Sequence, residues 1–178
     1  MKSATATPIE DVFHFCPQCG TPNETVGKIP FTCGNCNYAC FFGPVAAVGA
    51  LVTDDENRLL MVRRARDPGK GCWGLPGGFV DRGESIEAAL AREVLEETRL
   101  IVTSFKLMVT LPNTYNYRGI VAPVIDLFYE CDVENRDQIK LAEDELELYV
   151  WVRPTSEHLN NMAFPSNRIA IEKWLRES

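Results

Sequence analysis

Two Cys-x-x-Cys pairs near the start of the chain constrain its fold more than any other feature. Cys16 and Cys19 form the first pair, and Cys33 and Cys36 form the second, with thirteen residues between the pairs. Four thiolates on two such turns can close a tetrahedron around Zn²⁺. A segment of roughly forty residues buries too little apolar surface to be stable alone, so a bound metal is the expected substitute for a core.

This zinc site is expected to be structural, because four cysteine ligands leave no open position for water. Gly20 and Gly34 suit the tight backbone of the two turns. Cys40 is an alternative ligand with a less suitable spacing, and we expect it to be packed instead. Cys72 and Cys131 are expected to be small apolar core residues.

The composition changes near Gly43–Pro44, which predicts a domain boundary. Residues 1–42 carry five of the seven cysteines, whereas the rest of the chain is rich in Val, Leu and Ile. We therefore expect a zinc ribbon over 1–42 and a second domain over 43–178. Hydrophobic residues make up 46% of the chain, which is enough to offset the entropy of ordering. No run of ~18 apolar residues predicts a membrane span.

The chain is acidic, with 25 Asp and Glu residues against 18 Lys and Arg residues and a net charge of −7. A nucleic-acid partner is therefore not expected, because the phosphate backbone would be repelled. A small anionic substrate requires local positive charge or a bound metal. The odd number of cysteines, together with the lack of an apolar signal core in the first fifteen residues, predicts a cytoplasmic protein.

The apolar pattern after Pro44 predicts more strands than helices, without regular alternation. A helix is predicted over 85–98, because Ser85 is a good N-cap and alanine and leucine follow it. A second helix is predicted over 165–176, with an apolar stripe formed by Ile169, Ala170, Trp174 and Leu175. Strands are predicted at 45–53, 58–63, 77–80, 101–111, 121–132 and 146–152, the first two forming a hairpin. This order favours an α/β fold with a mixed sheet flanked by helices.

The helix over 85–98 carries a cluster of carboxylates. Glu93, Glu96 and Glu97 fall within an arc of ~100° around the helix, where they repel one another. A divalent cation would neutralise them, and oxygen ligands suit Mg²⁺ or Mn²⁺, which also bind phosphates. On the residues alone, a solvated acidic helix face is an equal alternative.

The segment from Gly78 to Leu100 resembles the Nudix box. The matching positions are Gly78, Glu84, Arg92, Glu93, Val94, Glu96, Glu97 and Leu100. Arg99 departs from the pattern, because the family has a helix-closing glycine there; we expect either a left-handed Arg99 or a different helix end. The resemblance extends from about Gly43 to the C-terminus, and zinc ribbons also precede such domains. It implies an α/β/α sandwich with a mixed sheet, which hydrolyses a nucleoside diphosphate linked to another moiety.

The resemblance also implies roles for individual residues. The implied ligands of Mg²⁺ or Mn²⁺ are Gly78 through its carbonyl, Glu84, Glu93, Glu96 and Glu97. Arg92 would orient a neighbouring glutamate, and Glu84 would act either beside the metals or on an additional one. The base that deprotonates the attacking water is either Glu93 or a carboxylate of residues 140–147, among which Glu145 is favoured.

The substrate is less constrained. Arg64 and Arg66 alternate onto one face of a predicted strand, where they would meet phosphates; a solvated hairpin end is an equal alternative. The expected small-molecule substrate is ADP-ribose, FAD or a related dinucleotide. Residues 111–117 lack the Ser-Gln-Pro-Trp-Pro-type motif of NADH pyrophosphatases, which argues against NADH as the main substrate. An NADH pyrophosphatase-type activity is kept as an alternative. A catalytically silent nucleotide-binding regulator is the alternative from another class, and a homodimer is compatible with the sequence.

Overall fold

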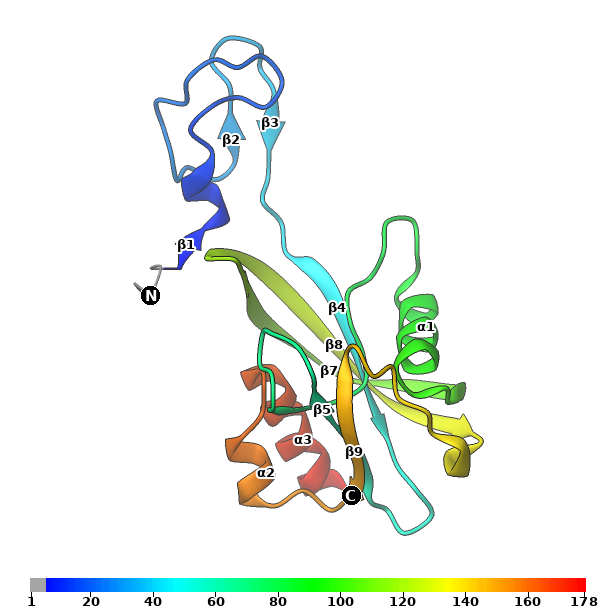
Figure 1. Cartoon of the computed structure of the whole chain (residues 1–178). Coiled ribbons are helices and arrows are strands. Elements are labelled where there is room, and N and C mark those ends of the chain that lie inside the picture. Colours follow the sequence, from blue (N-terminus) through cyan, green and yellow to red (C-terminus); the bar gives the residue numbers. More distant parts are fainter. Residues whose placement is uncertain (1–5) are drawn as a thin grey trace. The chain divides into compact units, whose positions relative to one another are not determined.

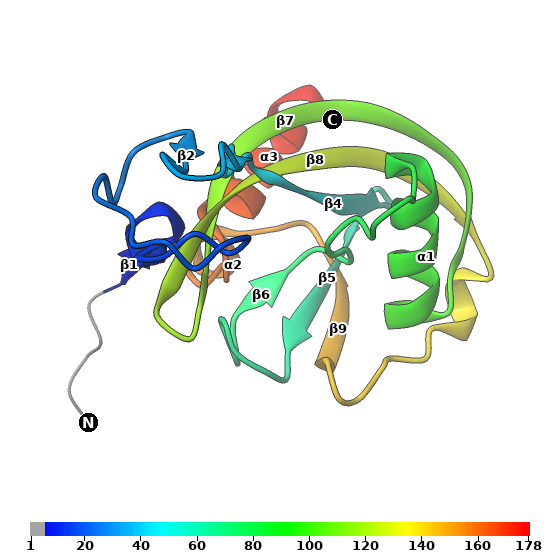
Figure 2. The same ribbon diagram turned by 90° about the horizontal axis from the view of Figure 1, so that it is seen from above.

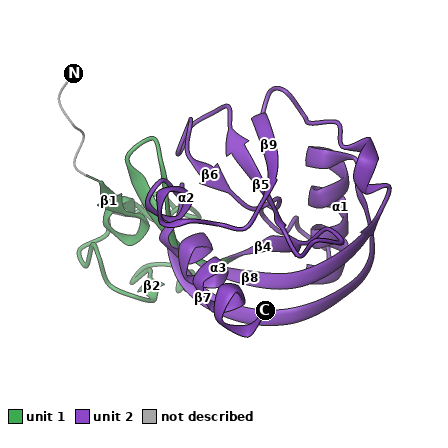
Figure 3. Ribbon diagram, turned by 90° about the horizontal axis from the view of Figure 1, so that it is seen from below, with its two compact units in different colours: residues 1–45, 114–124 green, residues 46–113, 125–178 purple. Residues whose placement is uncertain are grey.

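A computed structural model describes residues 6–178, which form two compact units (Figure 3). The first unit contains the residues up to Val45 together with Thr114–Val124, and the second contains Ala46–Asn113 and Ile125–Ser178. The first five residues of the predicted zinc ribbon lie outside the described range. No helix in that range is long and apolar enough to cross a membrane.

The first unit has a small core of thiols and aromatic rings. Its elements are β1 (Thr7–Pro8), a 3₁₀ turn η1 (Ile9–Val12), and the antiparallel pair β2 (Phe31–Thr32) and β3 (Ala39–Cys40). Phe31 is buried, and Phe13 packs edge-on against Phe42 with ring centroids 4.5 Å apart. Cys16 and Cys33 are buried in the same cluster. The aromatic rings therefore supply the little apolar burial that so short a segment can achieve.

The second unit carries most of the regular structure. Its elements are β4 (Val45–Val52, beginning at the unit boundary), β5 (Leu59–Arg64), β6 (Trp73–Gly74), α1 (Ile86–Thr98), η2 (Arg136–Gln138), β9 (Leu146–Val152), α2 (Ser156–Asn160) and α3 (Pro165–Glu177). It also contains most of β7 (Ile101–Tyr117) and β8 (Ile120–Glu134), whose adjoining ends, Thr114–Val124, belong to the first unit. In one sheet β8 pairs with β1, β4 and β7, and in the other β5 lies between β6 and β9. The pairing of β1 with β8 is parallel, whereas β5 pairs antiparallel with both neighbours.

Helices cover both faces of these strands, with α1 on one side and α2 and α3 on the other (Figure 1). Alternate side chains of β4 point to opposite faces, as the pleat of a strand requires. One core contains, from β4 and α1, Val48, Ala50, Val52, Ala89, Leu90 and Val94. The other contains, from β4 and α3, Leu51, Ala170, Ile171 and Trp174. The α/β/α sandwich with a mixed sheet is thus confirmed.

The β7–β8 hairpin is longer than the sequence predicts (Figure 2). Arg118 and Gly119 both have positive φ, 51° and 88°, as the central residues of a type I′ hairpin turn do. The pairing of β7 with β8 continues up to this turn, although the apolar pattern of the sequence ends near Leu111. Pro112 has no backbone N–H to donate, and it is tolerated because β7 is paired only with β8 among the described strands and so lies at the edge of the sheet.

Two other predicted elements differ from the structure. Residues 77–80 form no strand; only Phe79 makes an isolated bridge, to Ala47, and the short strand is Trp73–Gly74 instead. The predicted hairpin between the first two strands is confined to one bridge from Thr53 to Leu59, after which β4 and β5 enter different sheets.

The apolar stripe of α3 also differs by one residue. Ile171 is completely buried, whereas the predicted Ile169 is 47% exposed. We expect Ile171→Ala to lower the free energy of unfolding by about 2–5 kcal/mol, because it leaves a cavity in the core. The matched variant Ile169→Ala should change it by less than about 0.5 kcal/mol. Urea denaturation measures both values, and equal losses would contradict this assignment of the core face.

Candidate functional site

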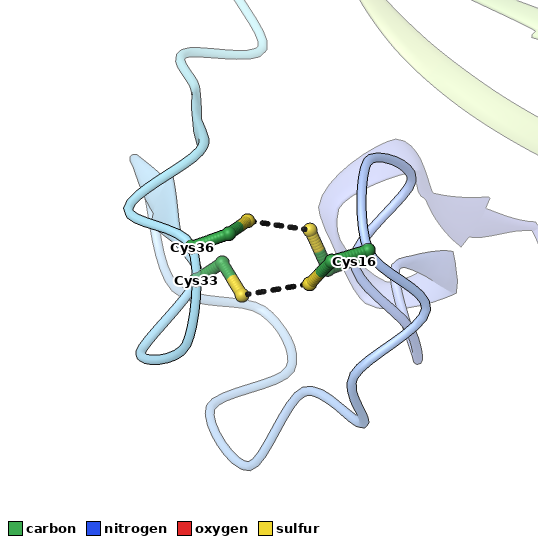
Figure 4. Close-up of side chains that lie close together, drawn as sticks. Cys16, Cys33 and Cys36 are labelled. Atoms are coloured by element: carbon green, nitrogen blue, oxygen red, sulfur yellow. Dashed lines mark hydrogen bonds between the residues drawn. The ribbon is translucent and has the colours of Figure 1, made fainter.

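The four thiols of the two Cys-x-x-Cys pairs converge in the first unit (Figure 4). The Sγ atoms of Cys16 and Cys36 are 3.6 Å apart, those of Cys19 and Cys33 are 3.7 Å apart, and all four lie within 4.8 Å of one another. A tetrahedral zinc with Zn–S bonds of about 2.3 Å places its sulfurs about 3.8 Å apart. Among residues 6–178, this is the only group of three or more metal-ligating side chains gathered so closely. The quartet fits a Zn²⁺ ion.

The two cysteine turns have the same backbone conformation. The N–H of Gly20 donates to the carbonyl of Cys16, and the N–H of Asn37 donates to that of Cys33, at 2.9 and 3.0 Å. Gly20 and Asn37 have φ of 74° and 61°. Gly34 lies in the second turn without positive φ, and Asn37, at the position equivalent to Gly20, takes the left-handed conformation, which asparagine tolerates better than most residues.

The other three cysteines lie outside this quartet. Cys40 packs against the aromatic core of the first unit, as predicted, and Cys131 is buried beside α1. Cys72 is only partly buried, so the prediction of a core position is wrong for it. It lies in a turn, where its carbonyl accepts the N–H of Arg64.

Helix α1 presents the carboxylates of the second unit. Ser85 caps its start by accepting the N–H of Ala88 at 3.2 Å, as predicted. Arg99 ends it with φ of 65°, donating its N–H to the carbonyl of Leu95. Of the two alternatives for Arg99, the left-handed one is therefore confirmed, and it costs roughly 1 kcal/mol relative to glycine. The helix keeps its full length despite the missing glycine.

Two glycines bring the backbone directly against these carboxylates. The N–H of Gly77 donates to Oε2 of Glu97 at 2.9 Å, and a Cβ on Gly78 would lie 2.6 Å from the carboxyl carbon of Glu93. The Gly78 carbonyl accepts the N–H of Val48 at 2.8 Å and keeps a second lone pair. Sequence reasoning does not single out Gly77, although the Gly77-Gly78 pair is the signal that would have found it. Any side chain at Gly78 would displace Glu93.

Arg92 gathers three carboxylates around one guanidinium. Its Nε and Nη2 each donate to Glu84 at 2.9 Å, and its Nη1 donates to Glu93 at 2.8 Å and to Glu96 at 3.2 Å. Nη2 also donates to the carbonyl of Phe79. The hydrogen bonds from Arg92 hold the pKa of Glu84 below its usual range. The guanidinium thus offsets part of the repulsion among these glutamates.

Glu97 is the most deeply buried of these glutamates, with only 5% of its surface exposed. Burial raises its pKa to about 8, with further contributions from the negative charges of Glu93 and Glu145. Burial also raises the pKa of Glu93, against the opposing effect of Arg92. Buried carboxylates crowded in this way are typical of sites that bind cations or perform catalysis.

The segment before β9 brings one more carboxylate to this cluster. The N–H groups of Lys140 and Ala142 donate to the carbonyls of Thr98 and Glu97, which fixes the segment at the end of α1. Glu145 is close enough that its charge raises the pKa of both Glu93 and Glu97.

The other three carboxylates of residues 140–147 have different surroundings. Glu143 and Asp144 are exposed, and Glu147 pairs with Arg63. Among the four carboxylates of 140–147, Glu145 is therefore the one whose charge acts on the α1 cluster.

Arg64 and Arg66 reach the site differently from the prediction. Strand β5 ends at Arg64, so strand alternation does not place Arg66. The Nε of Arg64 donates to the carbonyl of Pro68 at 2.7 Å, and its guanidinium lies over the ring of Phe164. Arg66 forms an ion pair of 2.6 Å with Glu145. Binding of substrate by these arginines stays a prediction.

The donor set fits Mg²⁺ or Mn²⁺. Four carboxylates and one carbonyl supply only hard oxygen ligands, which these ions prefer. The close approach of Gly78 to Glu93 brings the Gly78 backbone against that carboxylate, and the buried Glu97 carboxyl group adds further oxygen ligands. The residues that would hold the ion are Gly78, Glu93, Glu96 and Glu97, with Glu84 beside them.

Comparisons with known proteins agree with this geometry. Residues 43–174 match the family model described as NUDIX domain. An ADP-ribose pyrophosphatase of Methanocaldococcus jannaschii is 45% identical over 64 residues, 36% of this chain and 37% of that protein. An NAD-capped RNA hydrolase NudC of Vibrio atlanticus is 30% identical over 99 residues, 55% of this chain and 36% of that protein. The aligned part is less than half of either relative's length.

Solved structures share the fold. A MutT NUDIX hydrolase from Burkholderia pseudomallei superposes with a TM-score of 0.60 and 28% identity. The superposition covers 74% of this chain and 98% of that one. The match therefore extends over nearly the whole of a known domain of this kind.

The thiol quartet predicts that the purified protein contains about one equivalent of zinc without added metal. Cys16→Ser should lose most of it, whereas Cys40→Ser should retain it, because Cys40 lies outside the quartet. Elemental analysis measures the content. Chelation should remove the dispersed NMR signals of the Phe31 ring and leave those of Val94. A wild-type protein without zinc would contradict the assignment.

The buried Glu97 predicts an unusual pH dependence in protein that retains zinc but lacks Mg²⁺ and Mn²⁺. The folded state keeps the Glu97 proton up to a pKa of about 8, whereas the unfolded chain releases it near 4.5. Because the folded state binds more protons between these values, this group makes stability fall as the pH rises from about 5 to 8. Glu97→Gln should remove this fall.

Thermal unfolding between pH 5 and pH 8 measures the effect. Glu87→Gln, on the exposed face of the same helix, is the matched control and should keep the wild-type slope. Equal slopes of stability against pH for wild type and Glu97→Gln would contradict the raised pKa of Glu97 in the folded state.

Proposed function

The chain belongs to the Nudix family, and from this premise we propose that it hydrolyses the diphosphate bridge of a nucleoside diphosphate linked to a second group. The observation that supports this most is the convergence of Glu93, Glu97 and the Gly78 backbone within one oxygen-lined cluster. We propose residues 43–178 as the catalytic domain and residues 1–42 as a structural zinc ribbon.

In this proposal Gly78, Glu93, Glu96 and Glu97 would hold Mg²⁺ or Mn²⁺, which would neutralise charge on the diphosphate and make water at the site more acidic. Arg92 keeps Glu93 and Glu96 at fixed positions through its Nη1. Glu84 accepts two hydrogen bonds from the opposite side of the Arg92 guanidinium. Glu84 would therefore position Arg92, or alternatively bind a further metal ion.

The reaction is proposed as a direct attack by water. The water oxygen bonds to one phosphorus, the bridging P–O bond breaks, and the leaving phosphate group departs with the bridging oxygen. One proton of the water passes to a carboxylate oxygen of Glu145 or Glu93. His158, the one histidine of the second unit, contacts Trp73 and Thr155 rather than a serine or cysteine nucleophile. A covalent intermediate is therefore not part of the proposal.

We propose ADP-ribose or a related dinucleotide such as FAD as the substrate. The 45% identity to an ADP-ribose pyrophosphatase favours this choice. The likeness to an NAD-capped RNA hydrolase keeps an NADH pyrophosphatase-type activity as the second candidate. Both names imply a diphosphate attached to adenosine. A silent nucleotide-binding regulator is less favoured, because the carboxylates of the cluster are all present.

With ADP-ribose and Mg²⁺ we expect AMP and ribose 5-phosphate as the products, without free orthophosphate. In ¹⁸O-labelled water the label should enter one phosphoryl product directly, because water attacks phosphorus. Mass spectrometry of the products over a panel of ADP-ribose, FAD and NADH measures both points. Orthophosphate as the primary product, or a trapped phospho-enzyme, would overturn the mechanism.

The same assay tests the metal-binding carboxylates. Glu93→Gln and Glu97→Gln should each lower turnover at least ~10²-fold, since each removes a ligand charge and every tenfold corresponds to ~1.4 kcal/mol of barrier. Glu87→Gln is the control on the exposed face of α1 and should retain wild-type turnover. Near-wild-type rates in both ligand variants would place the chemistry elsewhere.

A further inference from the structure

We propose that the Arg66–Glu145 ion pair is opened by the substrate: a phosphate group of the diphosphate takes Arg66, and the released Glu145 carboxylate then accepts the proton of the attacking water. This inference rests on the proposed function and specifies how substrate binding prepares the base. The juxtaposition that carries it is an arginine paired with the carboxylate of Glu145, in a segment that the Ala142 N–H fastens to the Glu97 carbonyl at the end of α1.

The backbone around this pair is held independently of the side chains. The N–H of Ala65 donates to the carbonyl of Glu145 at 2.7 Å, and Glu145 donates its own N–H to Ala142. The side chains of Arg66 and Glu145 can therefore separate while the two segments stay together. An irregularity in the pairing of β5 with β9 adjoins this point, where Arg63 pairs with Leu148 and Arg64 with Leu146. Such bulges redirect side chains beside sites.

Glu145 lies close to the carboxylates that would hold the metal. The N–H of Ala142 donates to the carbonyl of Glu97, which fixes the segment three residues before Glu145 to the end of α1. The charge of Glu145 acts on both Glu93 and Glu97. In the structure Arg66 offsets part of the charge of Glu145, so that an exchange of partners would present a free carboxylate to the site.

Arg66 is better suited to this exchange than the other arginines around the site. Arg92 is bound to three carboxylates, and Arg64 is fixed by the carbonyl of Pro68 and the ring of Phe164. The Arg66 side chain is 56% exposed and that of Glu145 is 34% exposed. An ion pair so open to water is weak, whereas a guanidinium binds phosphate through two charge-assisted hydrogen bonds. The phosphate is therefore the stronger partner.

A binding cycle with full-length, zinc-loaded protein tests the exchange. The probe is α,β-methylene ADP-ribose with Mg²⁺, which cannot be hydrolysed at the bridge, and calorimetry measures its Kd. Glu145→Gln should tighten binding about two- to fivefold, because it releases Arg66 from an exposed ion pair. Arg66→Ala should weaken binding at least about tenfold. In the double variant Arg66→Ala/Glu145→Gln the tightening should disappear.

Turnover of ADP-ribose separates the roles of the two residues. Glu145→Gln should lower kcat at least ~10²-fold without raising KM, as expected for loss of a base. Arg66→Ala should raise KM by a larger factor than it lowers kcat. Arg63→Ala is the matched control, because it breaks the neighbouring ion pair with Glu147 and should change neither Kd nor KM.

Two results would overturn the exchange: unchanged or weaker binding of the probe by Glu145→Gln, or tightening that persists without Arg66. Thermal melts of all variants identify any loss of folding, and the Arg66→Lys variant, which keeps the charge, then replaces Arg66→Ala. Failure of the wild type to hydrolyse any dinucleotide would instead overturn the proposed function, while the binding cycle would still report on the ion pair.

Discussion

The mutual repulsion of carboxylates on α1 is the constraint on which the site depends. Arg92 holds three glutamates, and a fourth, Glu97, is buried nearby on the same helix with a pKa raised to about 8. A folded chain tolerates this arrangement only where the charges have partners. Arg92 is the partner for Glu84, Glu93 and Glu96, whereas Glu97 has the N–H of Gly77. The remaining charge is what a divalent cation would neutralise.

The sandwich explains why these groups meet. Strand β4 packs on α1 through one face, and its Val48 N–H also holds the Gly78 carbonyl. The Gly77-Gly78 backbone is thereby fixed between the strand and the helix, at a distance that excludes any side chain. On the other side, hydrogen bonds at the end of α1 hold the segment that carries Glu145. The site thus joins the Gly77-Gly78 turn and α1, which are close in the sequence, to the segment of Glu145, which lies more than forty residues further along the chain.

The first unit follows the same principle with sulfur in place of oxygen. Its four Sγ atoms lie within 4.8 Å of one another, and two turns closed by equivalent backbone hydrogen bonds hold them there. A few aromatic rings around Phe31 supply the apolar burial beside these thiols. Here the liganding groups replace the core that the segment is too short to form.

The sequence by itself determined the α/β class, the carboxylate face of α1 and the grouping of four cysteines in one metal site. Helix periodicity and Cys-x-x-Cys spacing are local properties that can be recognised without the fold. The tertiary structure decided which residues outside those motifs join them. Glu145 reaches α1 through backbone hydrogen bonds that no local pattern encodes, and Arg66 lies beyond the strand that was predicted to carry it. Ile171 replaces Ile169 in the core because the rotation of α3 is set by packing on the sheet. Long-range hydrogen bonds and packing fix such positions, and they depend on the whole fold rather than on neighbours in the chain.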